Sequence, residues 1–423
     1  MCEIDTVLLY HLIKRLSSNL GAFMGNKIKY YVHQVLSSLI ILLTYGAVLQ
    51  TFLIEYGLSE QQVNVYSSVM QIFQVATILL FSKVADRTRN IIKMSALMRL
   101  FEIPMIAMLL VLCFFTEINI VWVLVIIFAL GLLYNFSMGS RSVIDYKLPY
   151  NIIDIRDYGK VTAFGGILIG IFSVVFSLAL SLFQSKTEYF FSMKVVFLVS
   201  AVMIFAFVAA TALMKQTYKM PPLEKKQKTN IFKYKPYTHL IIPNLARGFC
   251  SGVIGLAVTI GYFTGVIDKT SSSYIVIITS AVTILGCIAY SFISKRVNDA
   301  YLHLTLGIAT AVLLPLLCLG GTVFFLVAYS IIFFVKIIVD YTVPVTITKI
   351  IDYKIAGQYS AWRMLLHTLG TSLSGFVCIP LFNLIGVMPT MILTGLLQLV
   401  CGVGYFIYLR KNPIGKIVQA VSQ

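Results

Sequence analysis

The sequence predicts an all-α membrane protein with twelve transmembrane helices in two pseudo-symmetric six-helix bundles. Three observations support this fold class. The chain of 423 residues is 59% hydrophobic and only 12% charged, about half the charge of a typical soluble domain. Apolar runs of about 20 residues recur along it, and a helix of that length crosses a bilayer. The second half also repeats features of the first, which indicates a duplicated multi-helix unit.

The duplication is visible at charged turns that follow apolar runs. Segment Ser82–Arg87 is echoed by Ser291–Arg296, which keeps the serine and the arginine. A second turn is echoed as well. Its repeated positions are Ile152, Ile153, Asp154, Gly159 and Ala163 in the first half, and Ile350, Ile351, Asp352, Gly357 and Ala361 in the second. Order and orientation are the same, so the repeat is parallel.

Apolar runs and charged turns together define the expected domains. Residues 1–31 form a cytoplasmic N-terminal segment, 32–213 the first bundle, 214–236 a basic linker, 237–409 the second bundle and 410–423 a cytoplasmic tail. The expected spans are 32–55, 61–81, 92–115, 119–140, 161–183, 190–213, 238–264, 272–293, 300–319, 321–344, 359–384 and 387–409. A long charged elbow, 141–160, is expected after the fourth span.

The formal net charge of +17 sets the expected orientation. Nucleic acid is excluded as a partner because the basic residues lie in loops between helices. Lys and Arg in short loops remain on the cytoplasmic side of a membrane, so we expect both termini in the cytoplasm. The expected location of the protein is the cell (inner) membrane. Among the outer connections, Lys186 and Lys269 are the clear basic exceptions.

Enzyme and metal signatures are absent from the sequence. The seven cysteines are scattered, mostly within apolar runs, and are interpreted as packing residues. No HExxH, GxSxG, Walker or CxxC motif occurs, so we expect no enzyme, metal or cofactor. Any transport must therefore be driven by a gradient, with a proton or sodium as the coupling ion.

The first charged turn resembles a motif of the major facilitator superfamily. That family's loop between its second and third helices commonly reads Gly-x-x-x-Asp-Arg-x-Gly, followed by basic residues. Here Ser82 stands at the first glycine, Asp86 and Arg87 match, and Arg89 replaces the second glycine. The resemblance implies a gate in which Asp86 and Arg87 hold the inner ends of the halves together, with Arg296 as the second-half counterpart. Lys295 stands where the second acid would be.

The subgroup is less clear from these residues. The fourth span has no basic residue before Arg141, and the fifth has no proline, which argues against a multidrug exporter. The turns Asp145–Pro149 and Asp352-Tyr353 are faintly similar to those of cation-coupled glycoside-pentoside-hexuronide symporters. The acidic pair that this subgroup carries in its second span is missing.

Charged residues inside spans are the main site candidates, because burying charge in a membrane is costly. Arg247, Lys336 and nearby Asn244 are assigned to substrate binding, and Asp340 and His367 to coupling. The spacing of Lys336 and Asp340 lets them pair on one helix face. The family arrangement implies that these residues line or flank the central pathway. A structural ion-pair network is the competing interpretation. Arg363 is assigned to the gate, or to snorkelling at the interface.

The first half offers further candidates. Arg99 and Glu102, three residues apart, are interpreted as a structural pair. Arg141 and Asp145 are assigned to a gate or anchor at the expected elbow. Four uncharged groups are assigned to solute hydrogen bonding or to bonds between helices: Tyr45, Gln50, Gln71 and Gln74.

These expectations define one function and two alternatives. The first is a monomeric secondary active transporter in the bilayer that imports a small polar solute, carbohydrate-like or anionic, coupled to a cation. The second is a proton-coupled exporter of drugs or metabolites. The third is a membrane scaffold or sensor that transports nothing.

Overall fold

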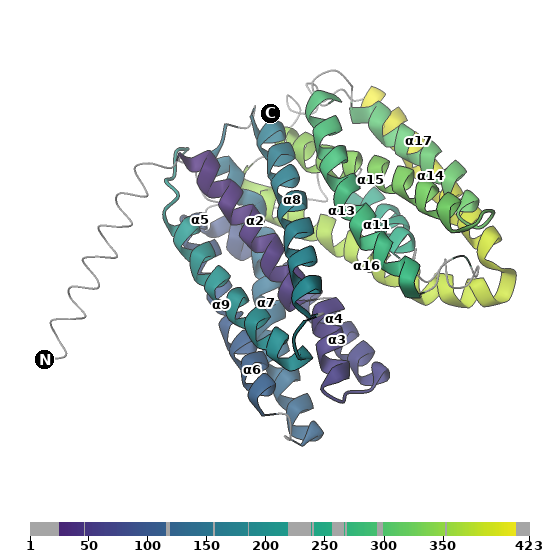
Figure 1. Cartoon of the computed structure of the whole chain (residues 1–423). Helices are drawn as coiled ribbons and strands as arrows, with labels where there is room; N and C mark the ends of the chain where they lie inside the picture. Colours follow the sequence, from purple (N-terminus) through teal and green to yellow (C-terminus); the bar gives the residue numbers. More distant parts are fainter. Residues whose placement is uncertain are drawn as a thin grey trace, which may run out of the picture. The chain divides into compact units, whose positions relative to one another are not determined.

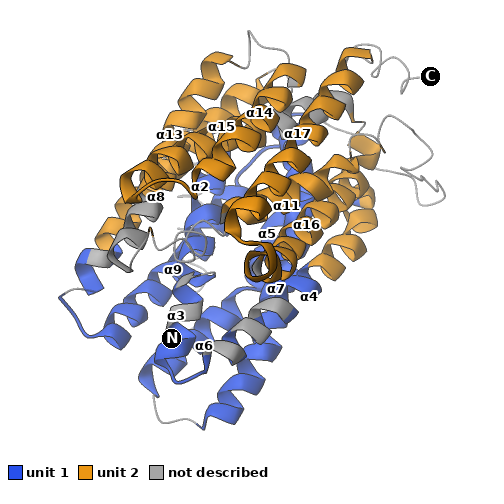
Figure 2. Ribbon diagram, turned by 90° about the vertical axis from the view of Figure 1, so that its right-hand side faces the viewer, with its two compact units in different colours: residues 1–74, 88–154, 180–221 blue, residues 75–87, 155–179, 222–423 orange. Residues whose placement is uncertain are grey.

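The computed structural model describes eleven segments of the chain. These are residues 25–45, 47–115, 119–154, 157–184, 186–218, 238, 241–255, 266, 269–293, 299–351 and 353–411. Contacts divide the chain into two compact units (Figure 2). The first unit comprises Met1–Gln74, Thr88–Asp154 and Leu180–Pro221, and the second comprises Val75–Arg87, Ile155–Ala179 and Pro222–Gln423. Two segments from the first half of the chain therefore pack with the second half.

Helices account for nearly all of the described residues (Figure 1). In the first half they are α2 (Asn26–Thr44), α3 (Ala47–Glu55), α4 (Glu60–Arg87), α5 (Ile91–Leu100), α6 (Ile103–Phe114), α7 (Ile120–Ile152), α8 (Tyr158–Gln184) and α9 (Tyr189–Ala212). In the second half they are α11 (Pro243–Gly255), α13 (Lys269–Ile293), α14 (Asp299–Leu316), α15 (Thr322–Ile350), α16 (Ala356–Ile385) and α17 (Val387–Lys411), with a 3₁₀ turn η2 (Tyr353–Ile355) before α16.

Eight segments of the described chain are long and apolar enough to cross a membrane. Ile278–Ile293 and Ala300–Leu316 are shorter apolar helices. The first expected span is divided, because Tyr45 takes an extended conformation between α2 and α3. The seventh expected span runs into residues 256–265, which lie outside the described segments. Several of the remaining expected spans agree with helices to within about three residues.

The expected elbow at 141–160 was wrong over its first part. Helix α7 continues without a break to Ile152, and Arg141 and Asp145 lie one turn apart inside it. Both side chains meet oppositely charged partners, so their charge does not require a loop. Composition alone marked this stretch as polar, whereas tertiary partners keep it helical.

The third expected span is a kinked pair of helices. A turn at Phe101 and Glu102 separates α5 from α6. Pro104 follows in the first turn of α6 and has no N–H to donate to the preceding turn. The break therefore places Glu102 at the N-terminal end of α6, where the helix dipole favours a negative charge.

The start of the expected linker is fixed within the first unit. The side chain of Asn26 accepts a hydrogen bond from the backbone N–H of Lys215 (2.9 Å) and donates to its carbonyl oxygen (2.7 Å). The carbonyl oxygen of Asn151 accepts from the N–H groups of Thr217 (2.9 Å) and Tyr218 (3.0 Å). This segment is therefore held by the ends of α2 and α7.

In the second unit, α11 and α16 pack with their backbones in close contact. A Cβ atom on Gly248 would overlap the carbonyl oxygen of His367, and one on Gly370 would overlap that of Leu245. The hydroxyl of Thr371 donates to the carbonyl oxygen of Gly248 (3.1 Å). Small residues allow such close crossings where lipid provides no hydrophobic driving force. This crossing holds Arg247 beside α16.

Replacing Gly248 with alanine should destabilise the second unit. The new methyl group must displace a helix backbone, so we expect a loss of about 1–3 kcal/mol in the free energy of unfolding. Denaturation of the purified protein in mixed micelles measures this loss. Gly375→Ala on α16 is the matched control, because nothing lies within 4 Å of that Cβ position. Equal stability of the two variants would contradict the close crossing.

Candidate functional site

The second unit contains a triad of charged side chains. Lys336 and Asp340 lie four residues apart on α15, and Arg247 comes from α11. Nη2 of Arg247 donates to Oδ1 of Asp340 at 3.2 Å, while Nζ of Lys336 donates to Oδ2. Two cations thus hold one carboxylate, and the triad carries one excess positive charge. The pairing predicted for Lys336 and Asp340 is confirmed.

This triad is partly open. The side chains of Arg247, Lys336 and Asp340 are 11%, 18% and 31% exposed, respectively. With Asp340 ionised, two cations face one carboxylate, and the triad keeps one excess positive charge at a partly exposed position.

Other residues predicted for this site lie around the triad. Asn244 is buried near the start of α11, and its amide nitrogen donates to the carbonyl oxygen of Ile241 (3.0 Å). His367 and Arg363 lie on α16, both partly buried. The backbone of His367 lies at the crossing of α11 and α16, next to Gly248. The triad itself consists of Arg247, Lys336 and Asp340.

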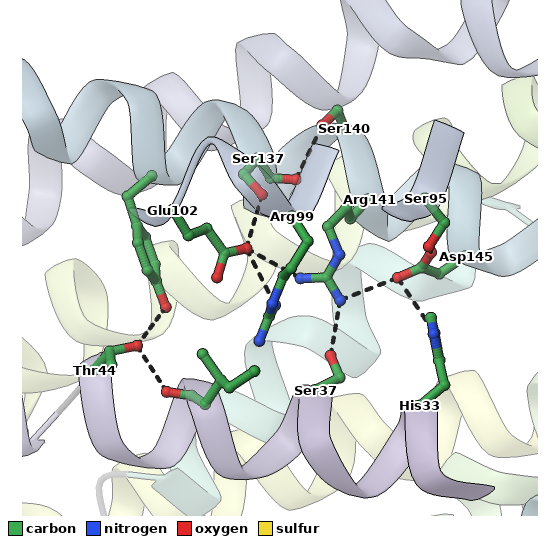
Figure 3. Close-up of polar contacts among 12 residues, drawn as sticks. His33, Ser37, Thr44, Ser95, Arg99, Glu102, Ser137, Ser140, Arg141 and Asp145 are labelled. Atoms are coloured by element: carbon green, nitrogen blue, oxygen red, sulfur yellow. Dashed lines mark hydrogen bonds and ion pairs between the residues drawn. The ribbon is translucent and has the colours of Figure 1, made fainter. Parts of the chain in front are cut away.

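The first unit contains a second and more deeply buried cluster of charges. It is formed by His33 on α2, Arg99 on α5, Glu102 at the α5–α6 turn, and Arg141 and Asp145 on α7 (Figure 3). Figure 3 shows these side chains converging between the helices, with Arg141 between the two carboxylates. The predicted pairing of Arg99 with Glu102 is confirmed at 3.1 Å, but the pair belongs to a larger network.

Glu102 is the sealed end of this network. Its Oε1 accepts hydrogen bonds from Arg99 (3.1 Å), Arg141 (3.1 Å) and Ser137 (2.7 Å). Both Glu102 and Arg99 are 0% exposed. The second oxygen of Glu102 has no hydrogen-bond partner among the described residues. Phe207 lies beneath both guanidinium groups, whose central carbons are 4.9 Å (Arg99) and 4.7 Å (Arg141) from the ring centroid.

Asp145 is the more exposed end of the network. Its side chain is 23% exposed, and it accepts hydrogen bonds from Arg141 (3.2 Å) and Ser95 (2.5 Å). Nε2 of His33 lies 3.8 Å from Oδ2 of Asp145, and the other ring nitrogen is 2.8 Å from the hydroxyl of Thr211. Arg141 also donates to Ser37 on α2 (2.8 Å). Arg141 therefore joins the sealed carboxylate to the accessible one.

Asp86 occupies a third position of interest, at the start of α16. Its Oδ1 accepts from the N–H of Gly357 (2.7 Å) and its Oδ2 from that of Gln358 (3.0 Å). These are first-turn N–H groups of α16, which have no acceptor within their own helix. The N-cap residue, Ile355, makes no side-chain hydrogen bond to them. The buried Asp86 therefore caps this helix from α4, and both groups belong to the second unit.

The remaining predicted residues are more dispersed. Tyr45 stacks on Tyr134 with ring centroids 6.0 Å apart. Gln71 is exposed on α4 and Gln74 is half-buried. Arg87 is exposed at the end of α4. Arg296 and the side chain of Gln50 lie outside the described residues.

Sequence reasoning missed one charged-site residue and the links between the others. His33 was not singled out, although it reaches Asp145 from a neighbouring helix. A usable signal was present, because a histidine within an expected span is rare and costly unless it has partners. The links from Arg141 to Glu102 and Ser37 depend on tertiary packing, which spacing along the chain does not reveal.

The structure was compared with known proteins. No protein-family model and no curated protein matches the sequence. Solved structures do match. An outward-facing bacterial homologue of the iron transporter ferroportin has a TM-score of 0.72 at 13% identity, covering 92% of this chain and 99% of that one. A variant of the Escherichia coli fucose:proton symporter FucP has a TM-score of 0.70 at 10% identity, covering 91% and 97%.

A third similar structure is the human organic anion transporter MFSD10, with a TM-score of 0.65 at 11% identity over 90% of this chain and 98% of that one. At such low identities the similarity concerns the fold. The chain therefore has the major facilitator fold, as the sequence predicted. With its long apolar helices, it is a multi-pass membrane protein.

Replacing Glu102 with glutamine should strongly destabilise the first unit. Arg99 and Arg141 would then lose the counterion they share, and breaking a buried ion pair costs about 3–5 kcal/mol. Denaturant unfolding in mixed micelles measures the loss. The exposed Glu188→Gln is the control, with an expected change within about 0.5 kcal/mol. A Glu102→Gln variant as stable as this control would show that the pair contributes little.

The cap made by Asp86 predicts a non-additive pair of mutations. Asp86→Ala should cost about 2 kcal/mol, because two buried N–H groups lose their acceptor. Gly357→Ala should also destabilise, since its Cβ would lie 2.6 Å from Oδ1 of Asp86 and 2.9 Å from the carbonyl oxygen of Ser82. The double variant should cost less than the sum, because the steric conflict with Asp86 is removed. Strictly additive losses would argue against the direct contact.

Proposed function

We propose that this protein is a secondary active transporter of a small polar solute that carries an anionic group. The fold supports transport, because the similar structures include a sugar symporter, an organic anion transporter and a homologue of a metal transporter. The single observation that carries the solute class is the triad of Arg247, Asp340 and Lys336. It is partly open and holds one excess positive charge.

In this proposal Asp340 acts as a counterion in the absence of solute. A carboxylate or similar group on the solute takes over hydrogen bonds from Arg247 and Lys336. The two cations then face two negative charges, so the site is neutral when loaded. Arg247 contributes most to recognition, because its planar guanidinium can donate two parallel hydrogen bonds to a carboxylate.

The remaining parts of the proposal follow from charge and fold. Lys and Arg in short loops favour both termini in the cytoplasm and insertion in the cell membrane. The chain acts as a monomer and imports its solute together with a cation, a proton or sodium. A gradient drives this transport, because the sequence carries no recognisable nucleotide-binding motif. The cap that Asp86 provides to α16 links segments far apart in the sequence, and we assign it to the gate that must open during transport.

Binding of a charged and an uncharged sugar tests the solute class. D-Glucuronate and D-glucose share a ring, and only the former carries a carboxylate. We expect D-glucuronate to stabilise the detergent-purified protein against heat. At a hundred times the dissociation constant, a ligand adds about 2.7 kcal/mol. Arg247→Ala should abolish this stabilisation, whereas Arg410→Ala, at an exposed arginine in the last turn of α17, should preserve it.

Other outcomes would replace the proposal. Stabilisation by D-glucose alone would favour a neutral carbohydrate, and stabilisation only by apolar cations would favour the exporter. Unchanged D-glucuronate affinity in Arg247→Ala would remove the triad from the solute site. Failure of every sugar, organic anion and drug tested would favour a scaffold or sensor.

A further inference from the structure

The charged triad of the second unit has a counterpart in the first. In each half of the chain, a long helix carries a basic residue followed four positions later by an aspartate. These pairs are Arg141 with Asp145 on α7, and Lys336 with Asp340 on α15. Both helices end at the repeated turn, α7 at Ile152 and α15 at Ile350. Asp145 lies seven residues before the end of α7, and Asp340 lies ten residues before the end of α15. The two distances differ by three residues, which is about one helical turn.

The third member completes the correspondence. In each unit, a base from the helix that opens that half reaches the aspartate. Arg247 on α11 donates to Asp340 at 3.2 Å, and His33 on α2 lies 3.8 Å from Asp145. The two triads therefore have the same construction, a base from the opening helix and a base–acid pair from the long helix. They differ chemically in that a histidine stands where the other unit has an arginine.

Because of this one difference, only the first of the two triads includes a side chain that normally titrates near neutral pH. An arginine remains protonated in proteins, whereas histidine is the side chain that normally titrates between pH 5 and 8. With His33 neutral, the first-unit cluster is balanced, since Arg99 and Arg141 compensate Glu102 and Asp145. One added proton gives it an excess charge of one, equal to that of the second triad.

The surroundings of His33 suit a single proton site. From α7 it faces Asp145, which is paired with Arg141, and Arg99 of α5 lies over the same Phe207 ring that His33 contacts. From α9 it meets the hydroxyl of Thr211 and the ring of Phe207, whose centroid is 4.4 Å away. On its own helix, Tyr30 stacks at 6.0 Å. His33 is 3% exposed, whereas the side chain of Asp145 is 23% exposed, so Asp145 is the more accessible member of this pair.

We propose that the triad of His33, Asp145 and Arg141 is the proton site of the transport cycle, and that the triad of Arg247, Asp340 and Lys336 is its permanently charged counterpart. The pair of His33 and Asp145, whose Nε2 and Oδ2 atoms lie 3.8 Å apart, takes up the proton. Its arrival weakens the attraction between Asp145 and Arg141, the residue that also binds Ser37 of α2 and Glu102. Protonation thereby changes how α2 is held against α7. This inference rests on the proposed transport function, which it deepens by locating the coupling ion.

Transport by the full-length protein in proteoliposomes tests the inference. Two assays with radiolabelled D-glucuronate and D-glucose separate translocation from coupling. Counterflow exchanges solute without net proton movement, and accumulation is driven by an imposed pH gradient. In a one-to-one symport, a gradient of about one pH unit supports about tenfold accumulation in the wild type. We expect His33→Asn to retain counterflow but to bring the accumulation ratio down to about one.

A second variant keeps the test independent of folding. The amide of the His33→Asn variant can still bond to Thr211, and His33→Arg reproduces the charge of the second triad. A structural role would be rescued by one of these two variants, whereas a proton site requires a group that titrates. We therefore expect both variants to lose pH-driven accumulation. Gradient-driven accumulation in either variant at the wild-type level would overturn the proposal.

The assays also distinguish this inference from the proposed function. Wild-type counterflow without pH-driven accumulation would overturn the proton site and leave solute transport standing. Loss of accumulation in His367→Asn, with His33→Asn unaffected, would move coupling to the second unit and overturn the inference. If wild-type protein neither binds nor exchanges either sugar, the proposed function fails, and the proton site fails with it.

Discussion

The neutralisation of charge inside an apolar medium is the constraint on which the site architecture of this protein depends. An isolated ion in a membrane-spanning helix is strongly unfavourable, so each buried charge must be met from a neighbouring helix. Arg99 and Arg141 are balanced by Glu102 and Asp145 across α5, the α5–α6 turn and α7, and these ion pairs keep the helices in register. The break between α5 and α6 places Glu102 where the guanidinium groups of Arg99 and Arg141 both bind it. The polar network is thus both a functional candidate and a part of the packing of the first unit.

The two units meet the same constraint with different degrees of closure. In the first, Glu102 and Arg99 are sealed from solvent, and only Asp145 is appreciably exposed. In the second, all three triad members retain some exposure. A sealed site can hold a proton but excludes a solute, whereas an open site can accommodate both. The close crossing of α11 and α16 supports the open site by fixing Arg247 on a rigid backbone rather than on a loop.

Much of the fold could be predicted from the sequence, and less of the site. Apolar runs located α9 and α17 to within two residues, because membrane burial depends on local composition. Spacing also identified the pairs Arg99–Glu102 and Lys336–Asp340, since residues three or four apart share a helix face. The elbow expected from Arg141 was wrong because its charge is compensated by Glu102 of the α5–α6 turn and by Asp145 within α7 itself. His33 escaped attention for the same reason: its importance depends on Asp145, more than a hundred positions away in the chain.

The cap on α16 also constrains the order in which the protein can be made. Asp86 and its partner Gly357 are 271 residues apart. At a synthesis rate of about 5–20 residues per second, the carboxylate waits roughly 15–50 s for the N–H groups that it will bind. During that interval the end of α4 must keep its charge in water at the membrane surface. The second unit, which takes Val75–Arg87 from the first half, therefore closes only after translation has reached α16. Biogenesis thus passes through a state in which the second unit is still incomplete.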